Sequence, residues 1–474
     1  MGKYQYDRVV IGGGAAGLTS SIWSAQLGSK TLIIEKENKI GGDCLHYGCV
    51  PSKSLIKSAH VYHLMKSAEH YGLPKGTIAP VDFSKVRDRI QGIIGTIQKN
   101  DSPEFFKKQY KIDTKFGSAR FVDRHTVELN GEEITAEKFI LATGSSPKIS
   151  PVDGLDRVKY LTNINIFSLD KLPESMIVLG GGPIGIEMAQ AFQRLGSTVT
   201  VIQSLDRILP KEDRDVSGLV QDLLEKEGVC FEMNANGKKV EQSGDIITVT
   251  IERKDGSRKM IKARALLVAT GRAPNVEGLD LEKAGVVYDQ SGIKVNRHLQ
   301  TTAKNIFACG DCNGGFQFTH VAEYEARIAA LNAKMPFPVL KTDYSAVAWC
   351  TYTDPEAASV GVNETTAKEK GIEYKVYQYE FTHLDRALAE GQNKGFVKIL
   401  TDTKGRLIGA QIVGLHAGEL IHEWVPVLNA KVDIGRIEKS IHIYPTLSQI
   451  NKKVSGSFLS GQSAWVKIAT YLLK

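Results

Sequence analysis

Two stretches of the chain repeat one pattern of apolar and polar positions. In the first, the apolar run Tyr6–Ile11 leads through a glycine-rich turn and a segment of helical spacing into a second apolar run, Thr31–Ile34. The same order returns between Met176–Leu179 and Thr198–Ile202. Two short apolar runs separated by a helical segment predict a strand–helix–strand unit with parallel strands. The chain is therefore predicted to contain two α/β units of the same design.

Each unit is closed by a further apolar strand that ends in a turn of small residues, at Phe139–Gly144 and Leu266–Gly271. Between the units, Ser84–Lys111 has the charge and spacing of one helical stretch. Gly117–Glu137 alternates like a β-meander that turns at Asn130-Gly131. We expect helices first and a meander after them.

The pattern changes from about Tyr344 onwards. Strands are expected at Phe396–Leu400 and Leu407–Val413, and a helix at Ala417–Leu428. Strands and helices without a glycine-rich turn predict a separate α+β domain.

The turn of the first unit has the spacing G-x-G-x-x-G at Gly12, Gly14 and Gly17, and its second strand ends at Glu35. Such glycines let the backbone approach a pyrophosphate, the helix N-terminus supplies donors, and the acid accepts from a ribose hydroxyl. A tight turn alone also needs glycine, but strand, helix and acid together favour a dinucleotide site.

The second unit has the same glycines at Gly180, Gly182 and Gly185, but Gln203 stands where the acid would be. A carboxylate at this position repels a 2′-phosphate, and Gln203 does not. Arg207 is a candidate contact for such a phosphate, although a single basic loop residue is more often solvated. NADH and NADPH both stay open as cofactors.

The composition of the chain limits the classes of protein to which it can belong. A chain of 474 residues with 42% hydrophobic and 24% charged residues predicts a soluble globule of about three domains. The net charge of +7 is not gathered into a basic block, so nucleic acid is not expected as a partner. No segment reaches 18 uninterrupted apolar residues and no cleavable leader is evident, which predicts a cytoplasmic protein without a transmembrane span.

Six cysteines are too few for a secreted disulfide framework. Two cysteines at a close spacing are therefore expected to be catalytic or metal-binding rather than structural. Cys44 and Cys49 are followed by Pro51, which suits the first turn of a helix. Cys49 is therefore expected at a helix N-terminus, where the dipole and nearby Lys53 favour its thiolate. The sequence predicts a dithiol/disulfide couple, and no metal site is expected.

These features together resemble one family. The run Gly41–Lys53, the two glycine triplets, Ala269–Arg272 and Cys309-Gly310-Asp311 stand in the order found in class I pyridine nucleotide-disulfide oxidoreductases, such as dihydrolipoyl dehydrogenase, glutathione reductase and mercuric reductase. The resemblance extends from Tyr6 to about Ser457. It implies an α/β protein with two Rossmann-like dinucleotide-binding domains, for FAD and NAD(P)H, and a C-terminal α+β dimerisation domain. The expected boundaries are 1–149 and 274–343 for the two parts of the FAD domain, 150–273 for the NAD(P) domain and 344–474 for the dimerisation domain.

The resemblance also implies residue roles and a homodimer. Cys49 would be the thiol nearer the flavin and Cys44 the interchange thiol, while Lys53 would approach the flavin and pair with Glu187. Asp311 would bind the ribityl or phosphate region of FAD, and Gly271 and Arg272 would lie near NAD(P)H. The full set of expected cofactor contacts is Gly12, Gly14, Gly17, Glu35, Gly42, Lys53, Thr143, Gly144, Gly180, Gly182, Gly185, Gln203, Gly271, Arg272, Gly310 and Asp311. The resemblance gives Cys309 and Cys312 no paired role, and isolated Cys230 and Cys350 are expected to be buried.

One segment departs from the family. Disulfide-reducing members carry His-Pro-Thr-x-x-Glu, whose His and Glu form an acid–base dyad that serves the interchange thiol across the dimer. Here Tyr444 replaces the His and Gln449 replaces the Glu. A tyrosine with a pKa of about 10 shuttles protons poorly at neutral pH, so slow thiol–disulfide exchange is predicted. His442 lies two residues away and is expected to be structural.

Tyr444 and the run Asp385–Gly391 resemble mercuric reductase, yet the C-terminal cysteine pair and the N-terminal metal-binding domain of those enzymes are not found. The favoured interpretation is a mercuric-reductase-like oxidoreductase that passes electrons from NAD(P)H through FAD and the Cys44–Cys49 disulfide to a small-molecule or metal-ion acceptor. A metal ion, a quinone, a small sulfur compound and oxygen all stay open. Dihydrolipoyl dehydrogenase and a non-catalytic, flavin-binding redox sensor are the alternatives.

The C-terminal run Ala464–Lys474 has apolar residues at helical spacing and no acids. Contact with an anionic membrane surface would suit a quinone acceptor. Packing on the body of the protein is expected instead.

Overall fold

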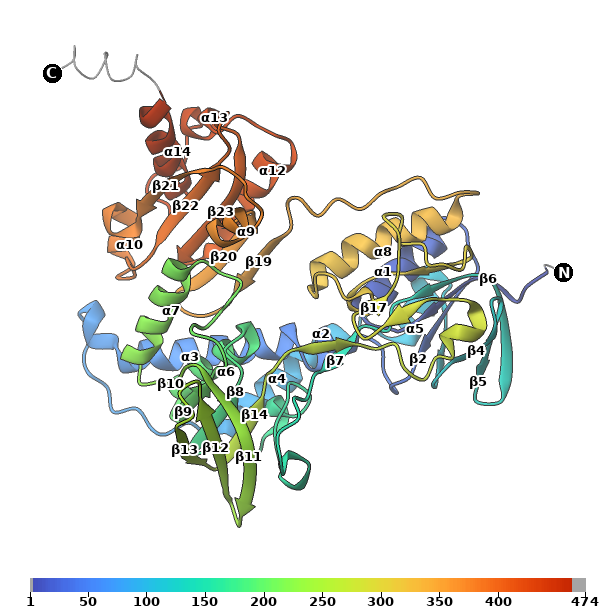
Figure 1. Ribbon diagram of the computed structural model, residues 1–474, viewed down its shortest axis with the longest axis horizontal. Coiled ribbons are helices and arrows are strands. Elements are labelled where there is room, and N and C mark those ends of the chain that lie inside the picture. The colour runs from blue at the N-terminus through green and yellow to red at the C-terminus, as the bar shows by residue number, and fades with distance from the viewer. Residues whose placement is uncertain (1–2, 463–474) are drawn as a thin grey trace.

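The first sheet is built from two distant parts of the chain. In the computed structural model, which describes residues 3–462, the parallel strands β3, β2, β1 and β6 lie side by side, and β18 joins the same sheet against β6 (Figure 1). Antiparallel β5 and β4 extend β6 as the expected meander. The strands are β1 (Tyr6–Ile11), β2 (Thr31–Glu35), β3 (Asp113–Phe116), β4 (Arg120–Asp123), β5 (Thr126–Leu129), β6 (Glu132–Leu141) and β18 (Ile306–Ala308). Helices α1 (Ala15–Gln26) and α8 (Thr319–Lys334) pack against each other beside it.

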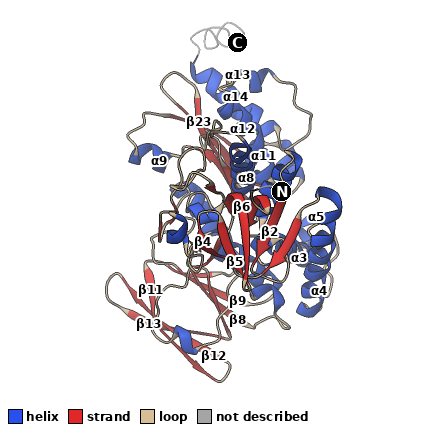
Figure 2. Ribbon diagram, turned by 90° about the vertical axis from the view of Figure 1, so that its right-hand side faces the viewer, coloured by secondary structure: helices blue, strands red, loops and turns tan. Residues whose placement is uncertain are grey.

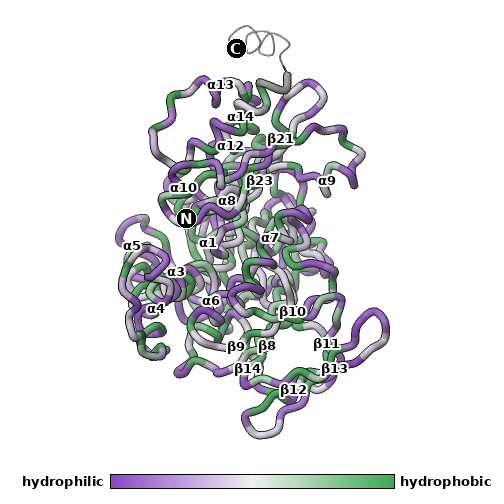
Figure 3. Tube along the Cα trace, turned by 90° about the vertical axis from the view of Figure 1, so that its left-hand side faces the viewer, coloured by the Kyte–Doolittle hydropathy of each residue, from purple (hydrophilic) through white to green (hydrophobic). Residues whose placement is uncertain are grey.

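The second nucleotide fold has its own parallel sheet, in the order β10-β9-β8-β14. Its members are β8 (Ser175–Leu179), β9 (Thr198–Ile202), β10 (Cys230–Glu232) and β14 (Ala265–Val268), with helices α6 (Pro183–Leu195) and α7 (Arg214–Lys226). Hydrophobic stretches of the chain run through this part of the molecule (Figure 3). An antiparallel sheet of β11 (Ala235–Ser243), β12 (Ile246–Arg253) and β13 (Arg258–Ala263) adjoins it. The predicted repeat of two α/β units is confirmed.

The charged stretch Ser84–Lys111 is not one helix, as predicted, but two. Helix α4 (Phe83–Gln98) ends before α5 (Pro103–Tyr110) begins. The Ser102 hydroxyl caps α5 by accepting the N–H of Phe105 at 3.2 Å, and Pro103 fits the first helical position because it has no N–H to donate. The short helix α2 (Gly42–His46) and the long helix α3 (Cys49–Lys66) precede them.

The third domain has a five-stranded antiparallel sheet in the order β19-β20-β23-β22-β21. It lies above the two nucleotide folds in Figure 2. The strands are β19 (Ala348–Thr351), β20 (Glu356–Gly361), β21 (Lys375–Glu380), β22 (Phe396–Thr401) and β23 (Leu407–Gly414). The helices are α9 (Glu364–Glu369), α10 (Asp385–Ala389), α11 (Ala417–Leu420), α12 (Trp424–Asn429), α13 (Gly435–Lys439) and α14 (Gln449–Gln462). Two short antiparallel strand pairs lie outside these sheets. They are β7 (Ser145–Pro147) with β15 (Arg272–Pro274), and β16 (Tyr288–Asp289) with β17 (Gly292–Ile293).

The helix predicted at Ala417–Leu428 is broken. A 3-10 turn, Ile421–Glu423, separates α11 from α12. Pro426 has no N–H to donate to the carbonyl of His422, which lies in that turn, so a continuous α-helix would leave this carbonyl without its intrahelical partner. None of the helices within residues 3–462 has the length and hydrophobicity of a membrane-spanning segment. The run Ala464–Lys474 lies outside the described residues.

A buried lysine joins the third domain to the second nucleotide fold. Lys398 on β22 is 1% exposed, and its Nζ donates to Asp213 at 2.9 Å, Asp215 at 2.8 Å and Glu364 at 3.0 Å. Two of these carboxylates belong to the start of α7 and one to α9. One cation thus compensates three acids at the boundary of two domains.

Replacing Lys398 with Met should destabilise the protein by about 3–5 kcal/mol, because the partly buried carboxylates lose their counterion. Denaturant unfolding of the purified protein measures this. The matched control is Lys368→Met, since the exposed Lys368 lies 3.9 Å from the same Glu364 and should contribute about 0–1 kcal/mol. Equal stability of the Lys398→Met variant and the wild type would contradict the prediction.

Candidate functional site

The two glycine turns have nearly identical backbone geometry. Gly12 has φ +112°, and a Cβ there would lie 2.2 Å from the carbonyl oxygen of Ala142. Gly180 has φ +115°, and a Cβ there would lie 2.3 Å from the carbonyl oxygen of Ala269. Only glycine fits such positions, so each turn lies directly against the strand that closes its fold. Gly14 faces open space apart from Gly42, whose Cα is 3.7 Å from the position of an added Cβ.

The residues that end the second strands are also equivalent. Glu35 is buried and accepts the N–H of Gly13 at 2.6 Å and of Glu37 at 2.9 Å. Gln203 is buried too, and its Oε1 accepts the N–H of Ser204 at 3.1 Å and approaches that of Gly181 at 3.5 Å. The amide of Gln203 therefore takes over the backbone contacts of the carboxylate without its charge.

Arg207 is not a free, solvated residue. Its guanidinium donates to the carbonyl of Pro210 at 3.0 Å, and Gln203 Nε2 donates to the carbonyl of Arg207 at 3.0 Å. These bonds fold the loop after β9 back on itself and occupy part of the guanidinium.

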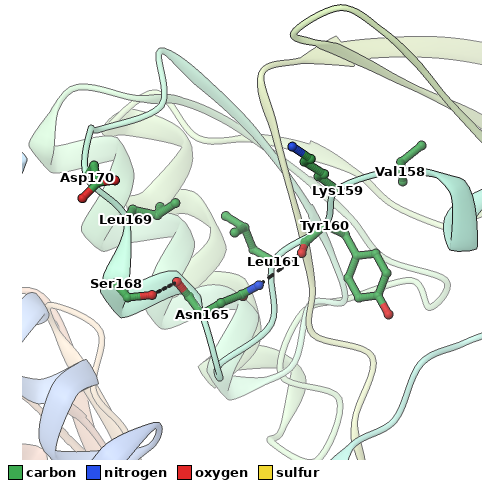
Figure 4. Close-up of a pocket in the computed structure, with 8 residues that line it drawn as sticks. All are labelled: Val158, Lys159, Tyr160, Leu161, Asn165, Ser168, Leu169 and Asp170. Carbon is green, nitrogen blue, oxygen red and sulfur yellow. Dashed lines mark hydrogen bonds between the residues drawn. The ribbon is translucent and has the colours of Figure 1, made fainter.

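One cavity of about 1190 Å³ joins the nucleotide folds and the third domain. Its lining includes Gly12, Gly14, Gly42, Thr143, Gly144, Gly271, Arg272, Asp311, Cys44, Cys49, Lys53 and Glu187. Its volume exceeds the roughly 300–1,000 Å³ usual for small-molecule sites, which fits a large cofactor. A second hollow of about 490 Å³, lined by residues between Val158 and Asp170, shares no residue with it and contains no cysteine (Figure 4).

The two cysteines lie at a helix junction. Cys44 is half-buried in α2, and Cys49 is the first residue of α3 and is exposed to the cavity. The Cys44 thiol hydrogen-bonds to Cys49, and the Thr319 hydroxyl lies 3.4 Å from Cys49 Sγ. The bonds from Cys44 and Thr319, together with the charge of Lys53, lower the pKa of Cys49 to about 6, whereas the bond to Cys49 and burial raise the pKa of Cys44. Cys49 is thus the thiolate and Cys44 the thiol.

Lys53 lies one turn beyond Cys49 and pairs with the second nucleotide fold. Its Nζ is 2.8 Å from Oε2 of Glu187 on α6, which is the pairing that the resemblance implies. The other oxygen of Glu187 accepts the N–H of Tyr352 at 2.9 Å. A charged contact between two domains therefore stands beside the thiolate.

Asp311 and Arg272 meet at Ser145. The Ser145 hydroxyl donates to Asp311 at 2.6 Å and accepts from Arg272 at 2.7 Å. Arg272 also lies 3.3 Å from Asp43, so its side chain bridges towards the cysteine segment. Burial raises the pKa of Asp311. Gly310 is held by Glu325, which accepts its N–H at 2.7 Å.

Sequence reasoning missed three of these residues. Ser145 directly follows Thr143-Gly144, so its place at the end of the closing strand was a usable signal. Thr319 and Glu325 carry no local signal, because only the folded chain brings them to Cys49 and Gly310.

Tyr444 and Gln449 do not line the cavity within one chain. Tyr444 is 66% exposed, and its hydroxyl donates to Asp385 at 3.1 Å, which raises its pKa. Gln449 is the first residue of α14. The His442 side chain is 9% exposed, and its Nε2 lies 2.9 Å from Glu423, in agreement with the structural role expected for it.

The other cysteines differ from one another. Cys309 and Cys312 are fully buried, and burial raises the pKa of both, that of Cys312 to about 12. Cys230 is exposed on the edge strand β10, so the expectation of a buried residue is wrong there. Cys350 is half-buried and lines the cavity. Among residues 3–462 no group of three His, Cys, Asp or Glu side chains is placed to hold a metal ion.

Alkylation of Cys49 by iodoacetamide should rise with pH through a midpoint near 6, because the thiolate is the reactive form. Thr319→Val removes the hydroxyl and should raise this midpoint by about one unit, since hydrogen bonds to charged groups contribute about 1.5–3 kcal/mol and one unit is about 1.4 kcal/mol. Mass spectrometry of the Cys49 peptide measures the rate. Thr319→Ser should restore the midpoint, and an unchanged midpoint in the Val variant would exclude a role for the hydroxyl.

Comparisons with known proteins agree with this geometry. A family model described as pyridine nucleotide-disulphide oxidoreductase matches residues 6–326, and the model of that family's dimerisation domain matches residues 347–454. The chain is 36% identical over 448 residues to a dihydrolipoyl dehydrogenase of Bacillus subtilis (strain 168), with 93% of this chain and 96% of that protein covered. It is 35% identical over 450 residues to a mercuric reductase of Bacillus cereus, with 94% and 70% covered.

Among solved structures, the HOCl-induced flavoprotein disulfide reductase RclA from Escherichia coli, as its Cu(II) complex, superposes with a TM-score of 0.85 at 27% identity. The match covers 96% of this chain and 99% of RclA. The expected fold class, with two dinucleotide-binding folds and a dimerisation domain, is confirmed. The chain belongs to the pyridine nucleotide-disulphide oxidoreductases and is a flavoprotein oxidoreductase that uses FAD and NAD(P)H.

Proposed function

We propose that this enzyme transfers electrons from NAD(P)H to a soft metal ion that binds directly to the Cys44/Cys49 thiols, and that it acts in the cytoplasm as a homodimer. FAD, when bound, supplies the relay of two electrons from the nicotinamide to the disulfide. One NAD(P)H converts the Cys44–Cys49 disulfide to one thiol and one thiolate, because its hydride supplies two electrons and one proton. One metal ion that takes two electrons, such as Hg(II), or two ions that take one electron each, such as Cu(II), then re-form the disulfide, and the proton of the thiol is released.

The observation that carries this proposal is that the Tyr444 hydroxyl is hydrogen-bonded to Asp385 and has a raised pKa. Reduction of a disulfide substrate requires a proton for the leaving thiolate, and a positioned acid–base group contributes about 10²–10⁴-fold to such steps. Tyr444 donates its proton to Asp385, and this bond raises its pKa further above neutrality. His442, the nearest imidazole in the sequence, is paired with Glu423. A metal ion bound by thiolates needs no such proton donor.

The chemistry of the thiols supports a metal acceptor. Thiolates are soft ligands, and Cys49 with its low pKa supplies one at neutral pH without a base. Binding of a cation by both sulfurs would displace the proton of Cys44. Mercuric reductase is among the relatives, and RclA has been solved as a Cu(II) complex. Hg(II) and Cu(II) are therefore the acceptors to assay first.

Two alternative functions are less well supported by these observations. Dihydrolipoyl dehydrogenase is favoured by the 36% identity, but that activity needs the proton shuttle that Tyr444 does not provide. A non-catalytic redox sensor would have no need of a thiolate beside a Lys53–Glu187 ion pair, which argues for turnover.

In stopped-flow measurements, NAD(P)H should reduce the flavin rapidly, while steady-state turnover with lipoamide or glutathione disulfide should be slow and turnover with Hg(II) or Cu(II) faster. Replacing Tyr444 with His and Gln449 with Glu together should raise disulfide turnover by about 10²–10⁴-fold and leave flavin reduction unchanged. The matched control is His442→Gln, which should not lower metal reduction. Rapid disulfide turnover by the unmodified enzyme would contradict the proposal.

The enzyme should accept NADH and NADPH with less than about a hundredfold preference, or roughly 3 kcal/mol, because Gln203 carries no charge and Arg207 is held by Pro210. Gln203→Glu should shift use towards NADH by repelling the 2′-phosphate. The ratio of kcat/KM values for the two cofactors measures both effects. A ratio that Gln203→Glu leaves unchanged would place the selecting contact elsewhere.

A further inference from the structure

The sheet of the third domain presents a row of side chains to the start of α7, which lies against this sheet (Figure 1). Trp349 on β19 is paired with Ser359 on β20, and Ser359 is paired with Gln411 on β23. Gln411 is in turn paired with Lys398 on β22. Residues that are directly paired across strands point to the same face of a sheet. Lys398 binds Asp213 at the start of α7, and the other three side chains reach the residue before it.

That residue is Glu212, which is 3% exposed. Its carboxylate accepts Nε1–H of Trp349 at 2.5 Å, the hydroxyl of Ser359 at 2.6 Å and Nε2–H of Gln411 at 2.9 Å. A buried carboxylate needs such donors in place of water. The indole N–H is the one polar group of a tryptophan side chain, so its bond to the fixed carboxylate sets the direction of the ring.

The loop that carries Glu212 is also bound to the second glycine turn. The N–H of Leu209 donates to the carbonyl of Gly181 at 2.8 Å, and the N–H of Glu212 donates to the carbonyl of Leu209 at 2.9 Å. Helix α6, which begins at the same turn, packs against β19. Trp349 belongs to the third domain, yet it is tied through Glu212 to the turn that receives the pyrophosphate of NAD(P)H.

The cavity marks the side of this nucleotide fold that faces the cysteines. Its wall includes Pro183, Ile184 and Glu187 from the first turns of α6, but not Gln203, which ends the second strand where the adenosine ribose is expected. The nicotinamide is the end of the cofactor that has to enter the cavity, because its hydride is passed to the flavin beside the cysteines. Trp349 lines the same cavity.

The flat faces of the Trp349 indole are not occupied. Tyr352, which lines the cavity from the same segment, already has Lys53 Nζ at 4.2 Å from its ring centroid. Within residues 3–462, no aromatic ring or cation stacks on Trp349 in this way. An aromatic ring that is held by its polar end at a cavity wall offers a face to a planar ligand.

We propose that the nicotinamide ring of NAD(P)H stacks on Trp349, and that Glu212 is a positioning residue that holds the indole for it. Hydride transfer uses one face of the nicotinamide, so the indole would cover the other. The oxidised ring is a cation, to which the negative face of the indole adds a cation–π attraction. The proposal concerns the electron donor and is independent of the metal acceptor proposed above.

The test is equilibrium binding to the oxidised, flavin-loaded enzyme, measured by titration calorimetry. NAD⁺ is compared with ADP-ribose, which is the same molecule without the nicotinamide, and NADP⁺ with 2′-phospho-ADP-ribose. Trp349→Leu should raise the Kd of the nicotinamide ligands by about three- to tenfold and leave the Kd of the ribose ligands unchanged. Trp349→Phe keeps an aromatic ring and should cause a smaller rise. Equal changes for both members of a pair, or no change for either, would overturn the proposal.

The role of Glu212 has its own test. Glu212→Gln places an amide N–H among the three donors and should weaken NAD⁺ binding, by a smaller factor than Trp349→Leu. In the Trp349→Phe background, which has no indole N–H to hold, the same change should add nothing. An equal effect in both backgrounds would exclude positioning through the indole.

The matched control is Trp23→Leu. Trp23 on α1 is also half-buried but does not line the cavity, so its replacement should leave the Kd of every ligand unchanged. Should Trp349→Leu fail to fold, fluorotryptophan placed at position 349 keeps the indole and its N–H. Its fluorine resonance should shift with NAD⁺ and not with ADP-ribose, and the same response to both ligands would contradict stacking on the nicotinamide.

Discussion

Lys53 and Glu187 form an ion pair between the helix that begins at Cys49 and the helix that begins at the second glycine turn. Glu187 is almost fully buried and Lys53 is one-third exposed, so the carboxylate depends on this partner for compensation. The pair fixes helix α3 relative to α6. The position of the thiol pair relative to the second nucleotide fold follows from it.

The third domain contacts the same two helices, α3 and α6. Glu187, Gln190 and Arg194 follow one another at helical spacing along α6, and all three bind the segment from Tyr352 to Asp354. His60, two turns beyond Lys53 on α3, binds Asp354 from the other side. The third domain therefore contacts both α3 and α6 through this one segment. Lys398 and its three carboxylates form a second polar junction between the third domain and the second nucleotide fold.

The sequence predicted those parts of the fold that local patterns encode. Tyr6–Ile11 and Thr198–Ile202 coincide with β1 and β9, because short apolar runs between turns are the signature of central parallel strands. Cys49 begins α3, and the position of Pro51 was enough to place it. The helix break at Pro103 could have been predicted from the proline itself. The contacts within the site could not be predicted in this way, because Thr319 lies 270 positions from Cys49 and Tyr352 lies in another domain from Lys53. No spacing rule relates such residues, and only tertiary packing brings them together.

Cys309 and Cys312 flank the Gly310-Asp311 turn, and their complete burial has a consequence for the lifetime of the enzyme. Oxidants attack the thiolate form of cysteine and proceed from sulfenic to irreversible sulfinic and sulfonic acids. Burial keeps both of these sulfurs protonated and away from solvent. Cys49 is ionised, but its neighbour Cys44 can trap an oxidised sulfur as a disulfide, which NAD(P)H then reverses. Cys309 and Cys312, which flank the Gly310-Asp311 turn, are therefore protected from oxidation, whereas an oxidised Cys49 can be recovered through Cys44.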